Sequence, residues 1–275
     1  MIQRPSLTDL KWSLSKELSL MKRKHWKFIL CAILLVGFVV HIIETAPYRW
    51  SGRLVSAIRT GDNEKALQLI EEGIEEGYSM DTPTLKPSWL TRLCECTSYT
   101  PLAVACYEHN VTIVEALLEN GSTIEGAKEG AGRSPVFFAL SAPYSSELLD
   151  VLILLADAGE DFGKDPYDGY PLHWASRCQF PQMSAEPLTK QEYHRGIADI
   201  IIFIMQHMPN PYVAHGNGRT ALHYAASKEN WYLCELLVSV YKFPLESRTN
   251  IDGLTAYDIA LQNNAPAEIL RLLMP

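Results

Sequence analysis

One short pattern of residues recurs along this chain at nearly constant spacing. Its clearest copy is Asn217–Ala226, in which a glycine turn leads directly into a short stretch ending in two alanines. Weaker copies are found at Tyr99–Ala105, Arg133–Ala139, Gly169–Ala175 and Gly253–Ala260. The aligned alanines are residues 105, 139, 175, 225 and 260, so the steps are 34, 36, 50 and 35 residues. A period of about 33 residues is typical of helical repeat arrays, so the sequence predicts an all-α solenoid.

The copies contain residue types that favour the start of a short helix. Thr or Ser before Pro can cap the helix, and Pro in the first turn gives up only an N–H that has no helical partner. An apolar residue follows and is expected to face the neighbouring repeat. These apolar residues are Leu102, Val136, Leu172 and Leu222. The alanine three residues later allows adjacent helices to approach closely.

Two copies, Tyr170–Ala175 and Thr220–Ala225, resemble the T-P-L-H-x-A signature of the ankyrin repeat family. The resemblance covers roughly residues 51–275 and implies a solenoid of about six helix-turn-helix repeats. The repeats are expected near residues 51–75, 97–127, 132–163, 168–212, 216–247 and 251–275. In this family the signature histidine, here His173 and His223, ties the turn of one repeat to its neighbour by hydrogen bonds.

Two segments break the period. Residues 76–97 lengthen the step between the first two repeats, and residues 178–194 lengthen the fourth repeat between its two helices. Surface loops accept insertions at little cost, so we expect both segments to be loops. The alternative is that they shape a recognition surface.

The amino-terminal region differs from the rest. Residues 1–27 carry seven Lys or Arg against two acidic residues, and apolar positions spaced as on one helix face predict an amphipathic helix. Residues 28–46 follow as a predicted transmembrane signal anchor, since the run 28–43 is interrupted only by His41. A poor cleavage site argues against a removed signal peptide, and the start could be Met1 or Met21.

This arrangement predicts a single-pass membrane protein. The basic residues before the apolar run should stay in the cytoplasm by the positive-inside rule, which places the repeat domain, residues 47–275, on the outer, periplasmic or extracellular face. The chain thus resembles exported, membrane-anchored ankyrin repeat proteins of bacteria. The whole chain carries a net charge of −8, with the excess of acid after residue 27. An acidic repeat domain is a poor partner for nucleic acid.

The family resemblance implies that a protein partner contacts the hairpin tips and the exposed sides of the first helices. The residues at those positions are Tyr99, Arg133, Tyr167, Asp168, Tyr170, Trp174, Asn217, Arg219, Tyr224 and Asp252. Trp174 and Tyr224 occupy matching positions. They either pack between repeats or anchor a ligand at the surface.

The sequence favours a binding module over an enzyme. It lacks the commoner catalytic and phosphate-binding signatures, so we expect no cofactor, no metal and no small-molecule substrate. Cys94 and Cys96 lie in the first insertion and form either a disulfide or merely adjacent thiols. The alternative function is that of a thiol redox or metal-handling accessory protein that uses this pair. Cys106 and Cys234 fall at core positions and are expected to be buried and inert.

Overall fold

The computed structural model describes residues 35–36, 44–84, 99–126, 133–163, 170–177, 189–249 and 252–275. The chain separates into two compact units, Met1–Ala46 and Pro47–Pro275. The residues described in these ranges include helices, turns and loops but no strand. The prediction of an all-α fold is therefore confirmed.

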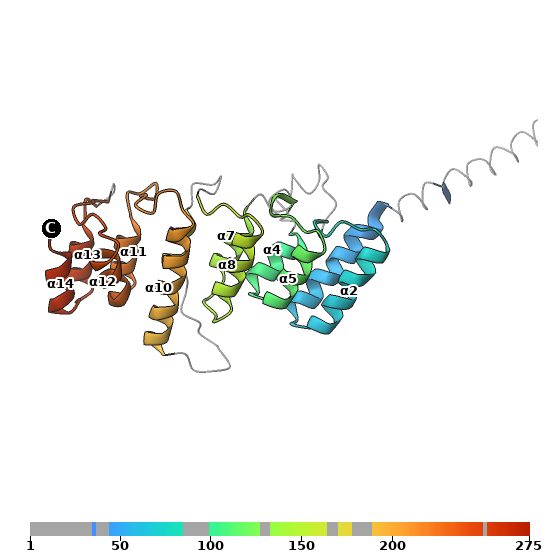
Figure 1. The fold of residues 1–275 in the computed structure, drawn as a ribbon, viewed down its shortest axis with the longest axis horizontal. Helices are drawn as coiled ribbons and strands as arrows, with labels where there is room; N and C mark the ends of the chain where they lie inside the picture. Colours follow the sequence, from blue (N-terminus) through green and yellow to red (C-terminus); the bar gives the residue numbers. More distant parts are fainter. Residues whose placement is uncertain are drawn as a thin grey trace, which may run out of the picture. The chain divides into compact units, whose positions relative to one another are not determined.

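The second unit is built of consecutive helix pairs (Figure 1). Residues 47–59 are helical and lie against α2. The helices are α2 (Asn63–Glu75), α4 (Pro101–Tyr107), α5 (Val111–Glu119), α7 (Pro135–Ser141), α8 (Leu148–Asp157), α9 (Pro171–Arg177), α10 (Lys190–Gln206), α11 (Ala221–Ser227), α12 (Trp231–Ser239), α13 (Ala256–Gln262) and α14 (Ala267–Leu273). Among the helices that the structure describes, each pair packs mainly on the pairs next to it, which is how a repeat array buries a continuous core.

The contacts run in two parallel rows. The first helices of the pairs contact one another in the order α4, α7, α9, α11 and α13, and the second helices in the order α2, α5, α8, α10, α12 and α14. One side of the unit is thus formed by first helices and the other by second helices. We call the former side the first-helix face.

Local sequence explains where these helices begin. Thr100 Oγ1 accepts a hydrogen bond from the Ala103 N–H at 3.3 Å, and Pro101 occupies the first turn. Ser134 and Pro135 repeat this arrangement at α7. Such caps satisfy amide groups that have no partner inside the helix. The predicted capping of these two helices is therefore confirmed.

The core is formed by the residues that the repeat pattern singled out. Leu102, Leu172 and Leu222 have no exposed surface, and Val136 is 1% exposed. The alanines aligned with Ala105 are buried as well. Fully burying a leucine side chain contributes about 1.5–3 kcal/mol, so each helix pair depends on its neighbours for much of its stability.

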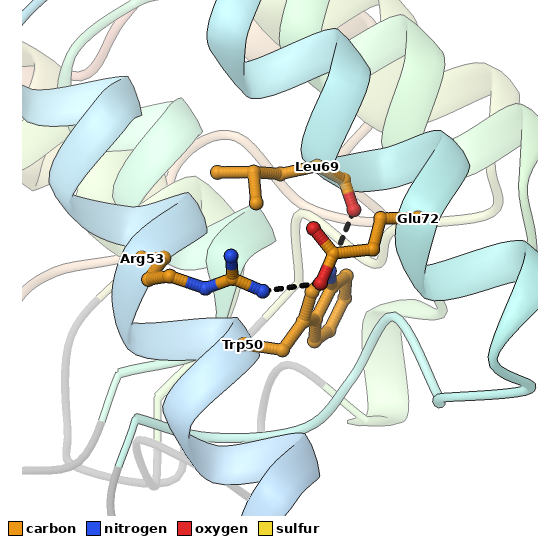
Figure 2. Close-up of polar contacts among 4 residues, drawn as sticks. All are labelled: Trp50, Arg53, Leu69 and Glu72. Carbon is orange, nitrogen blue, oxygen red and sulfur yellow. Dashed lines mark hydrogen bonds and ion pairs between the residues drawn. The ribbon is translucent and has the colours of Figure 1, made fainter.

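Trp50 fills the core of the first helix pair and is 1% exposed (Figure 2). The Trp50 Nε1–H donates a hydrogen bond to the Leu69 carbonyl at 2.6 Å, so the indole is satisfied inside the core. Beside it, Arg53 and Glu72 form an ion pair between the two helices. Gly73 lies directly against the indole ring of Trp50. A Cβ at this position would collide with the ring, so a glycine is needed here.

The first insertion is partly ordered against the repeats. Asp81 accepts hydrogen bonds from the hydroxyls of Ser122 and Thr123, at 2.7 and 2.9 Å, and Met80 is buried. The Thr84 N–H donates to the Tyr99 carbonyl at 3.0 Å. Residues 76–84 therefore pack on the second repeat and do not form a free loop, while residues 85–98 lie outside the described part of the chain.

The prediction that residues 178–194 are a loop is wrong in its last part. Helix α10 begins at Lys190 and has 17 residues, whereas α5 has nine and α8 has ten. Thr189 and Glu192 form a capping box that starts the helix early. In Figure 1, α10 extends beyond its neighbours. Residues 178–188 lie outside the described part.

The predicted amino-terminal elements fall mostly outside the described residues. Residues 1–27 are not described, and of the predicted membrane segment 28–46 only residues 35–36 and 44–46 are. Among the helices that the structure describes, none has the length and apolar character needed to cross a membrane.

Candidate functional site

Aromatic side chains of three repeats form a row on the first-helix face. The rings of Tyr99 and Phe138 meet edge to face with centroids 5.8 Å apart, and those of Phe137 and Phe138 at 5.5 Å. Phe137 continues the row to Trp174, with centroids 4.8 Å apart. Edge-to-face pairs at such distances are favourable and hold the rings in fixed orientations. We call Tyr99, Phe138, Phe137 and Trp174 the aromatic row.

Two arginines lie over this row. The Arg133 guanidinium carbon is 4.0 Å from the centre of the Phe137 ring, and that of Arg59 is 5.8 Å from the centre of the Tyr99 ring. Both are within the range of cation–π attraction. The row therefore combines apolar ring surface with positive charge.

A hollow of about 500 Å³ opens beside the row, between α4 and α7. Its lining residues are Arg59, Tyr99, Ala103, Val104, Tyr107, Glu108, Phe137, Phe138 and Ser141. Ala103 and Val104 are buried, whereas Tyr107 is 44% exposed. We call this feature the α4–α7 hollow. Its size and mainly apolar lining fit the pockets that receive an anchoring side chain.

The charges of the hollow are of both signs. Burial raises the pKa of the Glu108 carboxyl, and the positive charge of Arg59 opposes that rise. Glu108 and Arg59 thus influence each other electrostatically across the hollow. A partner can meet one acidic and one basic group beside the apolar floor.

A second cluster of rings lies further along the array. His173 contacts Tyr170 at 5.4 Å between ring centroids, and both His215 and Tyr224 at 5.5 Å. The Arg219 guanidinium carbon is 5.9 Å from the centre of the Tyr224 ring. Since Tyr224 is 5% exposed, this cluster packs between repeats and offers little ring surface to a ligand.

The two signature histidines differ in their hydrogen bonds. His223 Nδ1 accepts from the Thr220 N–H at 3.2 Å, and its Nε2 lies 3.0 Å from the Ser247 carbonyl. His223 is therefore tied to the segment that connects its own helix pair to α13. His173 has no hydrogen-bond partner on either ring nitrogen among the described residues. Tyr170 stands where Thr220 stands in the next copy, so the short hydroxyl side chain is missing.

The pKa of His173 reflects this environment. Burial and, to a smaller extent, the neighbouring His215 lower it from 6.5 to about 4, although the Val213 carbonyl acts in the opposite direction. That carbonyl approaches the ring without forming a hydrogen bond of ordinary geometry. At neutral pH His173 is an uncharged part of the core.

The structure distributes the predicted partner-binding residues over several places. Tyr99, Arg133 and Trp174 join the aromatic row, and Tyr170, Arg219 and Tyr224 belong to the second cluster. Asn217 and Asp252 lie in hairpin loops. Asn217 Oδ1 accepts from the Arg219 N–H at 3.1 Å, and Asp252 is exposed. Tyr167 and Asp168 lie outside the described residues.

Of the residues that line the hollow, sequence reasoning predicted only Tyr99 and missed five charged or aromatic side chains. They are Arg59, Tyr107, Glu108, Phe137 and Phe138. For Phe138 a signal was present, because it occupies the position of Trp174 and Tyr224 in the aligned copies. Arg59 and Glu108 come from different repeats, so their proximity depends on how the repeats stack.

The cysteines divide into two groups. Cys106 and Cys234 are buried free thiols, as predicted. Burial raises the pKa of both, that of Cys234 to about 12, so neither ionises readily. Cys94 and Cys96 lie outside the described residues, and their proposed disulfide or redox role stays a prediction. Among the residues that are described, no group of three metal-ligating side chains is found.

The stacked helix pairs and the signature residues define a helical repeat protein, and the comparisons identify the repeat. The sequence model described as "Ankyrin repeat" matches residues 217–242. The crystal structure of EF0377, an ankyrin repeat protein, is similar with a TM-score of 0.56 and 18% identity, over 81% of this chain and 96% of that chain. No curated protein sequence matches the chain. The chain thus contains an ankyrin repeat at residues 217–242 and has the fold of an ankyrin repeat array, as its motifs predicted.

Proposed function

We propose that the chain is a membrane-tethered protein-interaction module that holds a partner protein on its first-helix face. Ankyrin repeats generally mediate protein–protein interaction. The observation that carries the proposal is the α4–α7 hollow with the aromatic row along it. Stacked repeats present such a surface ready-formed, so that little conformational entropy is lost on binding.

The chemistry of the hollow indicates what it can receive. An aliphatic or aromatic side chain of the partner can enter the hollow beside the rings of Tyr99 and Phe138, which contact each other edge to face. Arg59 and Glu108 can then pair with charged groups on either side of that anchor. Interfaces typically derive most of their affinity from such a buried anchor and its charged surroundings.

Proximity labelling of the full chain, with the labelling enzyme fused after Pro275, tests this proposal. The wild type is compared with Arg59→Glu and Tyr107→Ala, and Arg271→Glu on α14 is the matched control. We expect one set of proteins to be labelled by the wild type and the control but at least about tenfold less by both hollow variants, as for an interface hot spot. Equal labelling by all four chains would contradict the proposal.

The tether is proposed from the sequence. Residues 28–46 form the apolar segment, and the basic residues before it keep the amino terminus in the cytoplasm, so the repeat domain faces outward. Extraction of membranes with alkaline carbonate tests the tether, because a spanning chain stays in the pellet. A reporter that is active only outside the cytoplasm, fused after Pro275, tests the orientation. Release of the chain by carbonate would contradict the tether, and an inactive reporter would contradict the orientation.

A further inference from the structure

The early start of α10 creates a second hollow, of about 390 Å³, against the beginning of α12. Its walls include Lys190, His194, Arg195, Glu229, Trp231 and Tyr232. The residues from α10 belong to its first two turns, which the shorter helices α5 and α8 lack. We call this feature the α10–α12 hollow. It lies at the amino-terminal ends of the second helices, away from the α4–α7 hollow.

Specific contacts hold the walls of this hollow together. Lys190 Nζ forms an ion pair with Glu229 Oε2 at 2.8 Å, and Asn230 Nδ2 donates to the His194 carbonyl at 3.1 Å. Asn230 is 2% exposed and also caps α12. The extension of α10 is therefore fixed to α12 and gives the hollow a defined shape.

The charge of the hollow is positive once this ion pair is formed. Lys190 and Glu229 offset each other, which leaves the Arg195 guanidinium as the remaining charge of the lining; Glu192, outside the lining, attracts it electrostatically. Burial and the nearby Lys190 lower the pKa of His194, so its ring is a neutral hydrogen-bonding group at pH 7. The aromatic wall consists of Trp231, which is half-buried, and Tyr232, which is 47% exposed.

We propose that the α10–α12 hollow is a second binding site, for an acidic peptide segment of a partner protein that carries an aromatic or aliphatic side chain beside a carboxylate. The carboxylate pairs with Arg195, and the apolar side chain lies on Trp231 and Tyr232. A bidentate arginine–carboxylate pair supplies both affinity and orientation. Anionic lipid is a poorer occupant, because lipid recognition by charge uses about four to eight Lys or Arg, and this lining has two.

Selection of short random peptides displayed on phage, with the full chain as the target, tests this site. Peptides that bind the wild type but not Arg195→Glu are collected, synthesised with a fluorescent label, and titrated by fluorescence anisotropy. We expect them to be enriched in Asp or Glu next to an aromatic or aliphatic residue. Their affinity should fall at least about tenfold for Arg195→Glu and for Trp231→Ala, because a charge reversal repels the carboxylate and the truncation removes the wall.

Two control variants separate this site from the proposed function. Lys65→Glu makes the same change of charge on α2, and Arg59→Glu alters the α4–α7 hollow, so both should leave the affinity of these peptides within about twofold. Circular dichroism and the melting temperature confirm that each variant is folded. The α4–α7 hollow and the α10–α12 hollow have no lining residue in common. If the proposal for the α4–α7 hollow fails, the predictions for the selected peptides therefore still stand.

Three results of the peptide experiment, and one of a parallel lipid titration, would overturn the inference. The first is that no selected peptide depends on Arg195. The second is that the dependent peptides are basic or purely apolar, and the third is that they lose affinity with Arg59→Glu as well. Short-chain phosphatidylserine, kept below its micelle concentration, is titrated in parallel. If it binds in an Arg195-dependent way while the peptides do not, the site is a lipid site and the inference is wrong.

Discussion

At the scale of single residues, His173 and His223 occupy the same position of neighbouring repeats and have different surroundings. His223 is tied to Thr220 and to the Ser247 carbonyl, whereas His173 contacts rings and has no hydrogen-bond partner among the described residues. A buried polar atom without a partner costs about 1–3 kcal/mol. The two histidines should therefore respond in opposite ways to the same substitution.

His173→Phe keeps a ring in the cluster and removes the unpartnered nitrogens. We expect it to leave stability at pH 7 unchanged or to raise it by up to about 1 kcal/mol, whereas His223→Phe should lower it by about 1–3 kcal/mol. Urea unfolding followed by circular dichroism measures both. A larger loss for His173→Phe than for His223→Phe would contradict this account of the two sites.

The lowered pKa of His173 makes stability depend on pH. The unfolded chain takes up a proton near pH 6.5, but the folded chain does so only near pH 4, so acid favours the unfolded state. The stabilisation is complete above about pH 6.5 and falls as the pH drops to 4, by about 3 kcal/mol in total. His173→Phe should therefore lose about 2 kcal/mol less than the wild type between pH 7 and pH 5 in urea titrations. An equal loss would show that His173 is not the cause.

Gly73 offers a second test at this scale. Its place against the Trp50 ring leaves no room for a methyl group, so Gly73→Ala should destabilise the protein by about 1–3 kcal/mol through overpacking. Gly52 lies in the facing helix, and a Cβ there meets no described atom within 4 Å. Gly52→Ala should stabilise by about 0.5–1 kcal/mol, because alanine favours a helix. Thermal unfolding of both variants checks the contrast, and a shift of the same sign in both would contradict it.

At the scale of the elements, the turns that join the helices use backbone conformations that favour glycine. Gly61 has φ = 70° in the turn before α2, and His109, Glu229 and Asn264 have φ of 51°, 54° and 55° in the corresponding turns. Lys242 has φ = 54° after α12. A non-glycine residue with positive φ is strained by about 1–2 kcal/mol. These turns therefore carry a conformational strain that a glycine at the same position would not have.

Lys242→Gly tests this strain. Lys242 is exposed, and we expect the substitution to raise stability by about 0.5–1 kcal/mol, since glycine adopts positive φ without a steric penalty. Lys228 is the matched control. It is also exposed but has φ = −99°, so Lys228→Gly should only lower stability, because it increases the entropy of the unfolded chain. Melting temperatures measure both changes. A lower melting temperature for Lys242→Gly would refute the assignment of strain.

The sequence predicts the regular elements better than the irregular ones. Thr100, Ser134 and the prolines after them mark helix starts by local chemistry, so no knowledge of the fold is needed. The repeat pattern does not place the start of α10 at Lys190, although Thr189 and Glu192 carry the capping-box signal, because a long loop explains the 50-residue step between repeats equally well.

The candidate site was predictable only in part. Tyr99, Arg133 and Trp174 follow from their positions in the repeat. Arg59 and Glu108 do not, because their approach depends on the stacking of helices that are distant in the sequence. The pattern also predicts Tyr224 as an anchor although its side chain is buried, since the sequence does not reveal which aromatic side chains a neighbouring repeat covers.

At the scale of the whole molecule, the described repeats form an array in which each helix pair contacts its neighbours. Such arrays are stabilised by the interfaces between repeats, so damage in one repeat also weakens the next. Leu222→Ala removes a side chain with no exposed surface and should cost about 2–5 kcal/mol. Hydrogen exchange should then show faster opening in α9 and α13 as well as in α11. Faster exchange confined to α11 would contradict a shared core.

The central claim is that a partner protein binds at the first-helix face, in the α4–α7 hollow. Site-specific photo-crosslinking in living cells tests it most directly, with a benzophenone amino acid placed at Tyr107 in the hollow or at Ile153 on the second-helix side. Both side chains are exposed, at 44% and 38%. The account predicts a crosslinked partner from position 107 that Arg59→Glu abolishes, and none from position 153. A partner captured only from position 153, or equally from both, would contradict the claim.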